Sequence, residues 1–269
     1  MRYEIRAMSF AEILDQGFRL VRDHFVPIVG LAATLQVPLA VLQAWAGGSL
    51  VAHSVTSGRI LAGVLMLLGL LVVAPAVGAA VTFALGETYL GHPPTMRESL
   101  GRAFRILLPL TGTMLLLWLL IAAAGALFVV PALVLRFVVL AGTVGPLLLV
   151  GIALVTVAYV GLGFMLATQV MVLEHAFGVA ALKRSAGLMR GNLLRGAGVT
   201  ALGALIVGVV GGVLQLALHF VPFVGPVGSG LARAAATAYT SAVLVVLYFD
   251  IRCRKEAFDL EHLARVVGG

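Results

Sequence analysis

The sequence predicts an all-α fold, a polytopic bundle of about six transmembrane helices, and three observations lead to this prediction. Apolar residues make up 61% of the chain and charged residues only 11%, whereas a soluble domain has about 45–50% and about 25%. Long apolar segments follow one another with short breaks, and basic residues gather in alternate connections. A water-soluble chain of 269 residues cannot enclose so large an apolar core, so we expect the bilayer to be its solvent.

Six segments are long enough to cross a bilayer, which requires roughly 20 mainly apolar residues. Because only short connections separate them, we expect one integral membrane domain over residues 1–269, with kinks where prolines fall inside spans. The predicted spans are about Val26–Ala46, Ile60–Gly86, Ile106–Val130, Pro146–Leu173, Gly198–Phe220 and Leu231–Phe249.

The charges of the connecting segments predict the orientation. Of 18 basic residues, 15 lie in residues 1–24, 87–105, 174–197 and 250–269, and every Asp and Glu lies there too. By the positive-inside rule, we expect a multi-pass protein of the cell inner (plasma) membrane with both termini in the cytoplasm. Basic residues beside spans serve orientation and lipid binding, so no nucleic-acid partner is expected. The expected lipid headgroup contacts are Arg102, Lys183, Arg184 and Arg252.

Residues 131–145 fit this scheme least well. The segment is too short to span, yet Arg136 stands there among apolar residues. An extra crossing would place the basic residues of 174–197 outside, against the charge rule. We expect a re-entrant or interfacial piece, although the sequence leaves open whether the segment belongs to a span.

An internal repeat precedes each pair of spans. Ser9–Leu14 and Thr95–Leu100 share a capping-box spacing, a hydroxyl followed three residues later by Glu. A third, weaker copy aligns Leu182, Ser185, Leu188 and Arg190 with Leu14, Gly17, Leu20 and Arg22. The first copy is amphipathic, as is typical of a helix lying in the membrane interface. The predicted unit is therefore an interfacial elbow helix plus a transmembrane hairpin. The elbows are 9–24, 95–105 and 179–192, and the repeats are about 9–86, 95–173 and 179–249, followed by a cytoplasmic tail, 250–269.

Glu87, Glu174 and Asp250 stand at the predicted cytoplasmic ends of the second, fourth and sixth spans. A carboxylate at a helix C-terminus opposes the helix dipole, and an arginine of an elbow helix would offset this cost. We therefore expect structural ion pairs, with solvated interface acids and a proton or ion site as the alternatives. The candidate partners are Arg19, Arg22, Arg105 and Arg190.

Three motifs resemble the membrane domain that is attached to some glycerophosphodiester phosphodiesterases and that also stands alone in bacterial proteins. They are Ser9–Asp15 with Phe18–Leu20, Ala180–Ser185 with Arg190–Asn192, and Tyr248–Arg252 with Lys255–Leu260. The resemblance implies six spans. The hydrolase activity of such proteins belongs to a separate barrel domain that this sequence does not include, so the resemblance carries over no catalytic residue.

The sequence contains few residue patterns that indicate catalysis or the binding of a metal or cofactor. Cys253 is the only cysteine, so no disulfide within the chain is expected, and the six histidines show no metal-ligand spacing. We expect no catalytic site, cofactor or metal. The Gly208–Gly212 spacing allows close helix approach, and we expect it to serve packing inside the chain rather than a dimer.

The expected function is that of a non-enzymatic accessory or scaffold subunit of a larger membrane complex. Its partners would be membrane lipids together with other membrane protein subunits or further copies of the chain. The alternative is a transporter or permease component for a lipid or small hydrophobic solute, since internal repeats are common in transporters. A lipid-modifying enzyme ranks third, because it would need a polar constellation that the sequence lacks.

The orientation can be tested by cysteine labelling. On a Cys253→Ser background, single cysteines at Leu100 and Ala186 should not react with a membrane-impermeant thiol reagent in intact cells, because both lie in predicted cytoplasmic segments. Labelling of either position from outside would contradict the six-span arrangement.

Overall fold

The computed structural model describes residues 6, 8–52, 55–137, 143–219 and 224–257, and the regular structure within them is helical. Six helical stretches in this part of the chain are long and apolar enough to cross a membrane, which confirms the predicted spans to within several residues at most of their ends. The elements are α1 (Phe10–Asp23), α2 (Phe25–Ala52), α3 (Val55–Leu68), a π-helical turn η1 (Gly69–Val73), α4 (Ala74–Tyr89), α5 (Met96–Phe137), α6 (Val144–Gly163), α7 (Ala167–Leu173), α8 (Val179–Met189), α9 (Leu193–His219) and α10 (Val224–Glu256).

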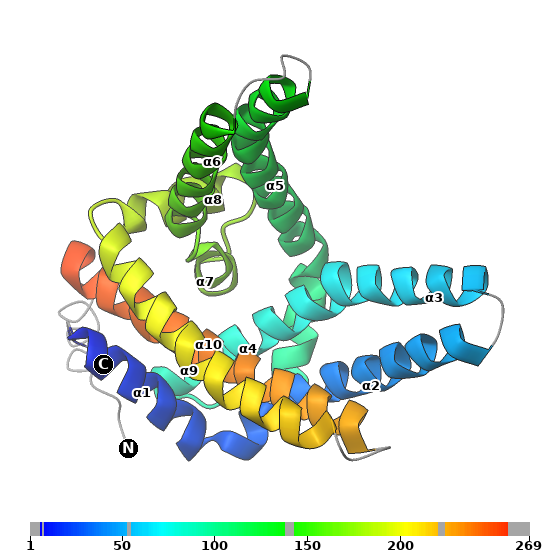
Figure 1. Ribbon diagram of the computed structural model, residues 1–269. Helices are drawn as coiled ribbons and strands as arrows, with labels where there is room; N and C mark the ends of the chain where they lie inside the picture. Colours follow the sequence, from blue (N-terminus) through cyan, green and yellow to red (C-terminus); the bar gives the residue numbers. More distant parts are fainter. Residues whose placement is uncertain (1–5, 7, 53–54, 138–142, 220–223, 258–269) are drawn as a thin grey trace.

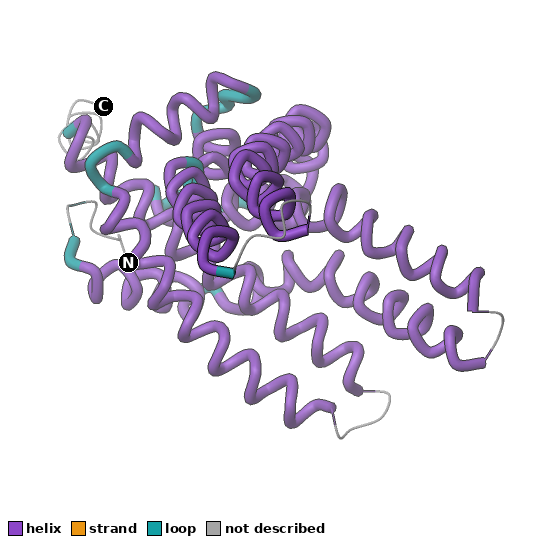
Figure 2. Tube along the Cα trace, turned by 45° about the horizontal axis from the view of Figure 1, so that its top comes forward, coloured by secondary structure: helices purple, strands orange, loops and turns teal. Residues whose placement is uncertain are grey.

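Three helical hairpins, α2–α3, α5–α6 and α9–α10, meet around α4 and α7 and splay apart beyond them (Figures 1 and 2). Helix α10 is the centre of the core and packs against α1, α2, α4 and α9. The α5–α6 hairpin packs mainly on itself and joins the rest of the described bundle mostly through α4. The core therefore lies beside α10, and the α5–α6 hairpin is its most exposed extension.

Helix α1 begins with the predicted capping box. Ser9 Oγ accepts from the Glu12 N–H at 3.3 Å, and Glu12 Oε2 accepts from the Ser9 N–H at 2.6 Å. The Ser9 backbone bond, helped by Arg6, lowers the pKa of the Glu12 carboxyl to about 2, so the cap is charged at neutral pH. Further along, a Cβ added to Gly17 would lie 2.9 Å from Val243 Cγ2. Glycine at this position is what lets α1 lie against α10.

The second predicted elbow helix, 95–105, is wrong. Thr95 and Glu98 do form the capping box, with bonds of 2.8 and 3.3 Å, but α5 then runs without a break from Met96 to Phe137. The first elbow ends at His24, which leaves the helical conformation, and the third ends at Gly191 with φ +81°. No such interruption follows residue 105, and Pro109 forfeits only one backbone hydrogen bond. The fold therefore does not show three repeats of an elbow helix followed by a hairpin.

Residues 131–137 also differ from the prediction of a re-entrant or interfacial piece. They continue α5 as helix, with Pro131 inside it, and α6 begins at Val144. Arg136 lies in the last turn of α5, where a cation interacts favourably with the helix dipole. Residues 138–142 of the predicted piece lie outside the described part. At the other end of the chain, α10 extends to Glu256, so the predicted tail boundary at residue 250 falls inside a helix.

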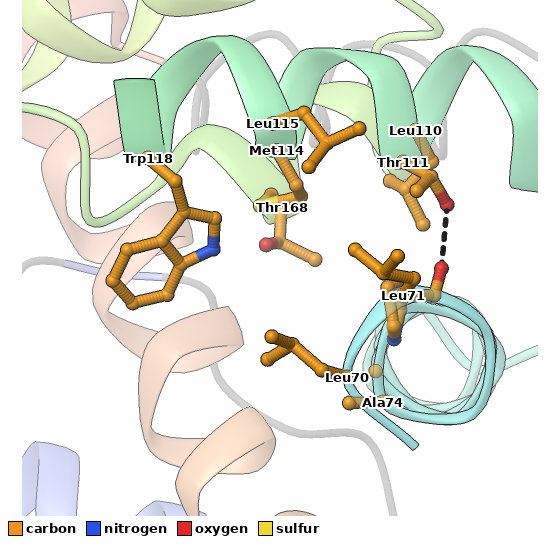
Figure 3. Close-up of a pocket in the computed structure, with 11 residues that line it drawn as sticks. Leu70, Leu71, Ala74, Leu110, Thr111, Met114, Leu115, Trp118 and Thr168 are labelled. Carbon is orange, nitrogen blue, oxygen red and sulfur yellow. Dashed lines mark hydrogen bonds between the residues drawn. The ribbon is translucent and has the colours of Figure 1, made fainter. Parts of the chain in front are cut away.

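The second span changes its winding beside a proline. In η1 the Ala74 N–H bonds the Gly69 carbonyl, five residues back. Pro75 follows and has no N–H to give to a preceding carbonyl. The Leu71 carbonyl instead accepts a hydrogen bond from Thr111 Oγ1 of α5 at 3.1 Å (Figure 3). A hydroxyl on the neighbouring span thus satisfies a backbone group that the proline leaves open.

The fourth span is broken between α6 and α7. Phe164 to Leu166 form a tight turn in which the Phe164 N–H bonds the Val160 and Gly161 carbonyls. The Gly163 carbonyl accepts from Ser185 Oγ of α8 at 3.2 Å. The short helix α7 then packs against α4, α8 and α10. The break is tolerated at membrane depth because neighbouring groups satisfy the freed backbone.

The contact at Pro75 gives a stability prediction. Thr111→Val should lower the free energy of unfolding in detergent by about 1 kcal/mol, because it leaves the Leu71 carbonyl unsatisfied. On a Pro75→Ala background the same change should cost much less, because the alanine N–H can bond a carbonyl of the preceding turn. A double-mutant cycle measures this coupling.

Thr156→Val is the matched control for this cycle. Thr156 Oγ1 bonds the Ile152 carbonyl of its own helix at 2.9 Å, so its loss should change stability by less than about 0.5 kcal/mol. Equal costs of Thr111→Val in both backgrounds would show that the hydroxyl does not serve the proline.

Candidate functional site

Ionised side chains gather at one end of the bundle, around the last two turns of α10. Tyr248, Arg252 and Glu256 recur every four residues on one face of α10 and meet α7 and α8. Asp250 and Arg254 lie on the opposite face and meet the N-terminal segment and α9. Spacing by four residues aligns side chains along a helix, whereas a step of two places them on opposite sides. One helix end therefore holds two separate networks.

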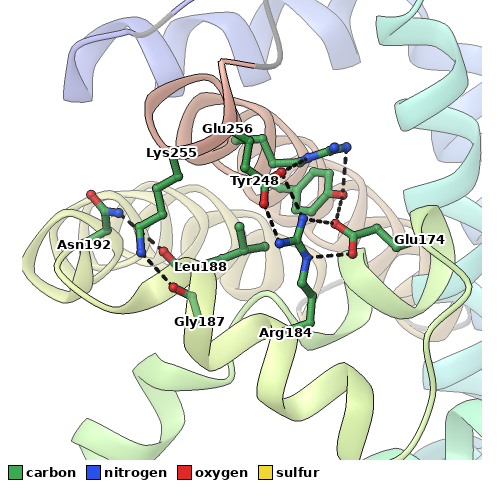
Figure 4. Close-up of polar contacts among 9 residues, drawn as sticks. Glu174, Arg184, Gly187, Leu188, Asn192, Tyr248, Lys255 and Glu256 are labelled. Atoms are coloured by element: carbon green, nitrogen blue, oxygen red, sulfur yellow. Dashed lines mark hydrogen bonds and ion pairs between the residues drawn. The ribbon is translucent and has the colours of Figure 1, made fainter. Parts of the chain in front are cut away.

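The Glu174 network consists of Glu174, Arg184, Tyr248, Arg252 and Glu256 (Figure 4). Glu174, which follows α7, accepts from Arg184 Nε at 2.8 Å and from the Tyr248 hydroxyl at 2.7 Å. Arg184 also donates through Nη1 and Nη2 to Glu256, and Arg252 Nε donates to Glu256 at 2.8 Å. The bonds to Glu174 and Glu256 raise the pKa of the Arg184 guanidinium. Two carboxylates thus balance two guanidinium groups.

Lys255 adds a clamp beside this network. Its ammonium donates to the carbonyls of Gly187 at 2.7 Å and of Arg190 at 2.6 Å, at the C-terminal end of α8 (Figure 4). These are carbonyls that a helix leaves without an internal partner, and a cation there is favourable. The end of α10 is thereby fastened to the middle of α8 through Arg184 and to its C-terminal end through Lys255.

The Asp250 network consists of Met8, Arg195, Asp250 and Arg254. The Asp250 side chain is fully buried, and it accepts from the Met8 N–H at 2.7 Å, Arg195 Nε at 2.8 Å and Arg254 Nε at 3.2 Å. The Met8 carbonyl accepts from both arginines. Arg195 also lies over the Phe10 ring, 5.2 Å from its centroid. This carboxylate ties the N-terminal segment, α9 and α10 into one unit.

The predicted acids have different environments. Glu174 and Asp250 lie in ion pairs, but their partners are Arg184, Arg195 and Arg254 rather than the arginines named from sequence. Asp250 is not at a helix end, since α10 continues to Glu256. Glu87 is half-buried in the last turn of α4. Among the described residues it takes part in no ion pair.

The predicted arginines also lie elsewhere. Arg19 pairs with Asp15 at 2.9 Å and Arg22 with Asp23 at 3.3 Å, both on the exposed side of α1. Arg105 is exposed and has no ion pair within the described ranges. Arg190 offers its carbonyl to Lys255. Four residues of the two networks were not predicted from the sequence, namely Arg195, Arg254, Tyr248 and Glu256. The four-residue spacings along α10 are the signal that groups the last three with Asp250 and Arg252.

The expected headgroup contacts divide into two groups. Arg184 and Arg252 are occupied by the Glu174 network. Arg102 lies over the Phe83 ring at 4.6 Å from its centroid, with Nη2 2.5 Å from His175 Nε2. Of the four, Lys183 is exposed, whereas Arg102, Arg184 and Arg252 are half-buried.

A cavity of about 420 Å³ lies in the apolar part of the bundle, away from these networks. It is bounded by η1, α4, α5 and α7, at the point where the Thr111–Leu71 bond crosses between spans (Figure 3). Thr168 of α7 and Trp118 of α5 supply polar atoms to an otherwise apolar wall. Within the described residues, no group of three or more His, Cys, Asp or Glu side chains is placed to bind a metal ion.

Six apolar spans and a charged end closed by internal ion pairs define a multi-span α-helical membrane protein. Within that class, the chain belongs to the family described as Domain of unknown function (DUF8558), whose model matches residues 48–252. Searches of the curated proteins and of the solved structures give no match. The relation to the membrane domain of glycerophosphodiester phosphodiesterases stays a prediction, because the matched family does not carry that name.

The choice of partner for Glu174 can be tested with variants. Glu174→Gln should lower the free energy of unfolding by about 1–2 kcal/mol, since the pair is only partly buried. Arg184→Gln added to it should cost little more, whereas Arg190→Gln, the control, should have a small and additive effect. Asp250→Asn should cost about 3–5 kcal/mol, because it removes a fully buried carboxylate and leaves Arg195, whose side chain is 15% exposed, without its counter-ion.

Thermal unfolding in detergent measures these effects. Additivity of Glu174→Gln with Arg184→Gln, or coupling with Arg190→Gln, would contradict the Glu174 network as drawn.

Proposed function

We propose that this chain is a non-enzymatic accessory or scaffold subunit of a larger complex in the inner membrane of a bacterial-type cell, with both termini in the cytoplasm. The observation that carries the proposal is an unpartnered glycine face on α9. A Cβ added at Gly208, Gly211 or Gly212 would meet no atom of the described residues within 4 Å. The expectation that this spacing serves packing inside the described chain is therefore wrong.

The two halves of α9 differ. In the first half, added Cβ atoms at Gly196 and Gly198 would lie 2.4 Å from Met189 Cε and 3.1 Å from Phe10 Cε1, so these glycines pack inside the chain. The half around Gly208 and Gly212 has no such neighbour. Glycines four residues apart let two transmembrane helices approach closely. A helix of another subunit is the partner that this surface suits.

Lipid-facing surface is abundant elsewhere. Of the most apolar 18 residues in each span, 67% are buried in α10 but only 6% in α5. Lipid tails are as apolar as leucine side chains, so apolar exposure alone does not drive helix association. The exposed large side chains of α5 therefore suit contact with lipid, whereas the glycines of α9 allow a second helix to approach closely. For this reason the glycine face of α9 is the better candidate for the contact surface.

The polar networks support a structural role over catalysis. In the Glu174 network each ionised side chain is bound to an opposite charge. Catalytic groups need to reach a substrate, and here the lone pairs of Glu174 are taken by Arg184 and Tyr248. The resemblance to a membrane domain that stands alone without its hydrolase agrees with this role.

A second candidate is a transporter or permease component for a lipid or small hydrophobic solute. It is favoured by the cavity of about 420 Å³ beside the π-helical turn and by the broken fourth span. Interrupted helices at mid-membrane form the binding sites of many transporters, and π-helical turns often occur at functional sites. Solute flux through vesicles containing this protein alone would favour this candidate.

The glycine face gives the test of the first proposal. Gly208→Leu with Gly212→Leu should abolish copurification of partner subunits from native membranes, because the new side chains hold a partner helix away. Val210→Leu is the control, since Val210 is on the opposite side of α9 and is 63% exposed. Melting temperatures of the purified chain should be alike for all variants. Recovery of the same partners with the leucine pair would refute the role of this face.

A further inference from the structure

A second cavity lies at the far end of the α5–α6 hairpin, opposite the charged end. Its volume is about 270 Å³. The wall combines one basic side chain and one hydroxyl at the hairpin tip with apolar side chains one and two turns deeper on each helix. The lining residues are Val129, Ala132, Leu133, Arg136, Thr143, Pro146, Leu147 and Val150. The cavity is thus amphipathic along the helix axes, polar at the tip and apolar below.

The guanidinium of Arg136 takes part in no ion pair among the residues that the structure describes. Every Asp and Glu of the sequence lies in the segments that adjoin the charged end or in the termini. Among the hydrogen bonds, ion pairs and ring interactions of the described residues, Arg136 takes part in one, with the ring of Phe137 at 5.8 Å from its centroid. Arg233, which is also remote from the charged end in sequence, differs because it donates to Gln43 Oε1 at 3.2 Å.

Helix length places Arg136 at the level of lipid headgroups. Arg105 and Arg136 lie on the same unbroken helix, and at 1.5 Å per residue they are about 46 Å apart. A bilayer with its headgroups is about 40–45 Å thick. With α5 along the bilayer normal and Arg105 at one surface, Arg136 lies at the other, and Val129 lies about 10 Å deeper, in the hydrocarbon.

We propose that this cavity binds one anionic phospholipid, with its phosphate on Arg136 and an acyl chain along the groove between α5 and α6. The guanidinium supplies donors of the geometry that suits a phosphate. The exposed side chains of Leu133 and Leu147 flank the groove. They give the acyl chain of the lipid an apolar surface like the one that surrounds it in the bilayer. Water would find few polar partners in the apolar part. This site is independent of the subunit role proposed above.

Fluorescence quenching can report occupancy of this cavity. In a Trp45→Phe, Trp118→Phe background, which removes the two native tryptophans, Leu147→Trp places a reporter in the wall; Leu147 is 67% exposed, so the larger ring is tolerated. The protein is reconstituted into phosphatidylcholine vesicles that contain graded fractions of chain-brominated phosphatidylglycerol or chain-brominated phosphatidylcholine. The apparent affinity for phosphatidylglycerol should be about fivefold higher, the factor that one basic residue contributes at an anionic surface.

Two variants and one competitor make the result specific. Arg136→Gln should abolish the preference and Arg136→Lys should keep part of it, whereas Arg233→Gln, which removes the same charge elsewhere, should leave it unchanged. Excess inorganic phosphate should not displace the brominated lipid. Melting temperatures and circular dichroism check that each variant is folded.

Three results would overturn the proposal. The first is equal affinity for the two lipids with Arg136 present. The second is that Arg136→Gln and Arg233→Gln lose the preference for phosphatidylglycerol equally. The third is displacement of the brominated lipid by inorganic phosphate, which would indicate a site for a free anion. None of these outcomes depends on whether partner subunits bind α9, because the assay contains this chain alone.

Discussion

The fold depends on one buried carboxylate. Asp250 accepts hydrogen bonds from the Met8 backbone, Arg195 and Arg254, and its side chain is fully buried. An ionised group so placed is tolerated only when its charge and its lone pairs are satisfied. The arginines meet that condition and also bind the Met8 carbonyl. The start of the chain is thereby fixed before α1 begins, and α1 can lay its apolar face on α10.

The opposite face of α10 fastens the remaining elements by the same means. Tyr248 and Glu256 hold Glu174 and Arg184 from the segments after α7 and within α8. Polar contacts concentrate at this end, whereas the α5–α6 hairpin joins the rest of the described bundle mostly through α4. Away from the charged end, Gln36 of α2 bonds Thr237 of α10 and Arg233 of α10 bonds Gln43 of α2. In lipid no hydrophobic force drives the hairpins together, since the bilayer solvates apolar side chains as well as a protein core does. The splayed shape in Figure 1 is what this distribution of forces produces.

Local features could be predicted from the sequence and relations between helices could not. The spans follow from hydropathy within single segments, and the boxes at Ser9 and Thr95 follow from spacing within one turn. The partner of Glu174 depends on the rotation of α8 about its axis, which selects Arg184 over Arg190. The break after Arg22 and the lack of one after Arg105 rest on single-residue backbone conformations near His24 and Pro109. Hydropathy carries no signal for either.

The departures from regular helix are informative about where the bundle can change shape. Leu70 and Leu71 of the π-helical turn at Gly69–Val73 line the cavity of about 420 Å³, and the break before Ala167 ends two residues before Thr168, which also lines it. Each relies on a hydroxyl from another helix, Thr111 in one case and Ser185 in the other. A backbone satisfied by a side chain can exchange that bond for another more readily than one inside a continuous helical ladder. The charged end therefore supplies the fixed frame, and motion of the hairpins relative to it would be absorbed at these two interruptions.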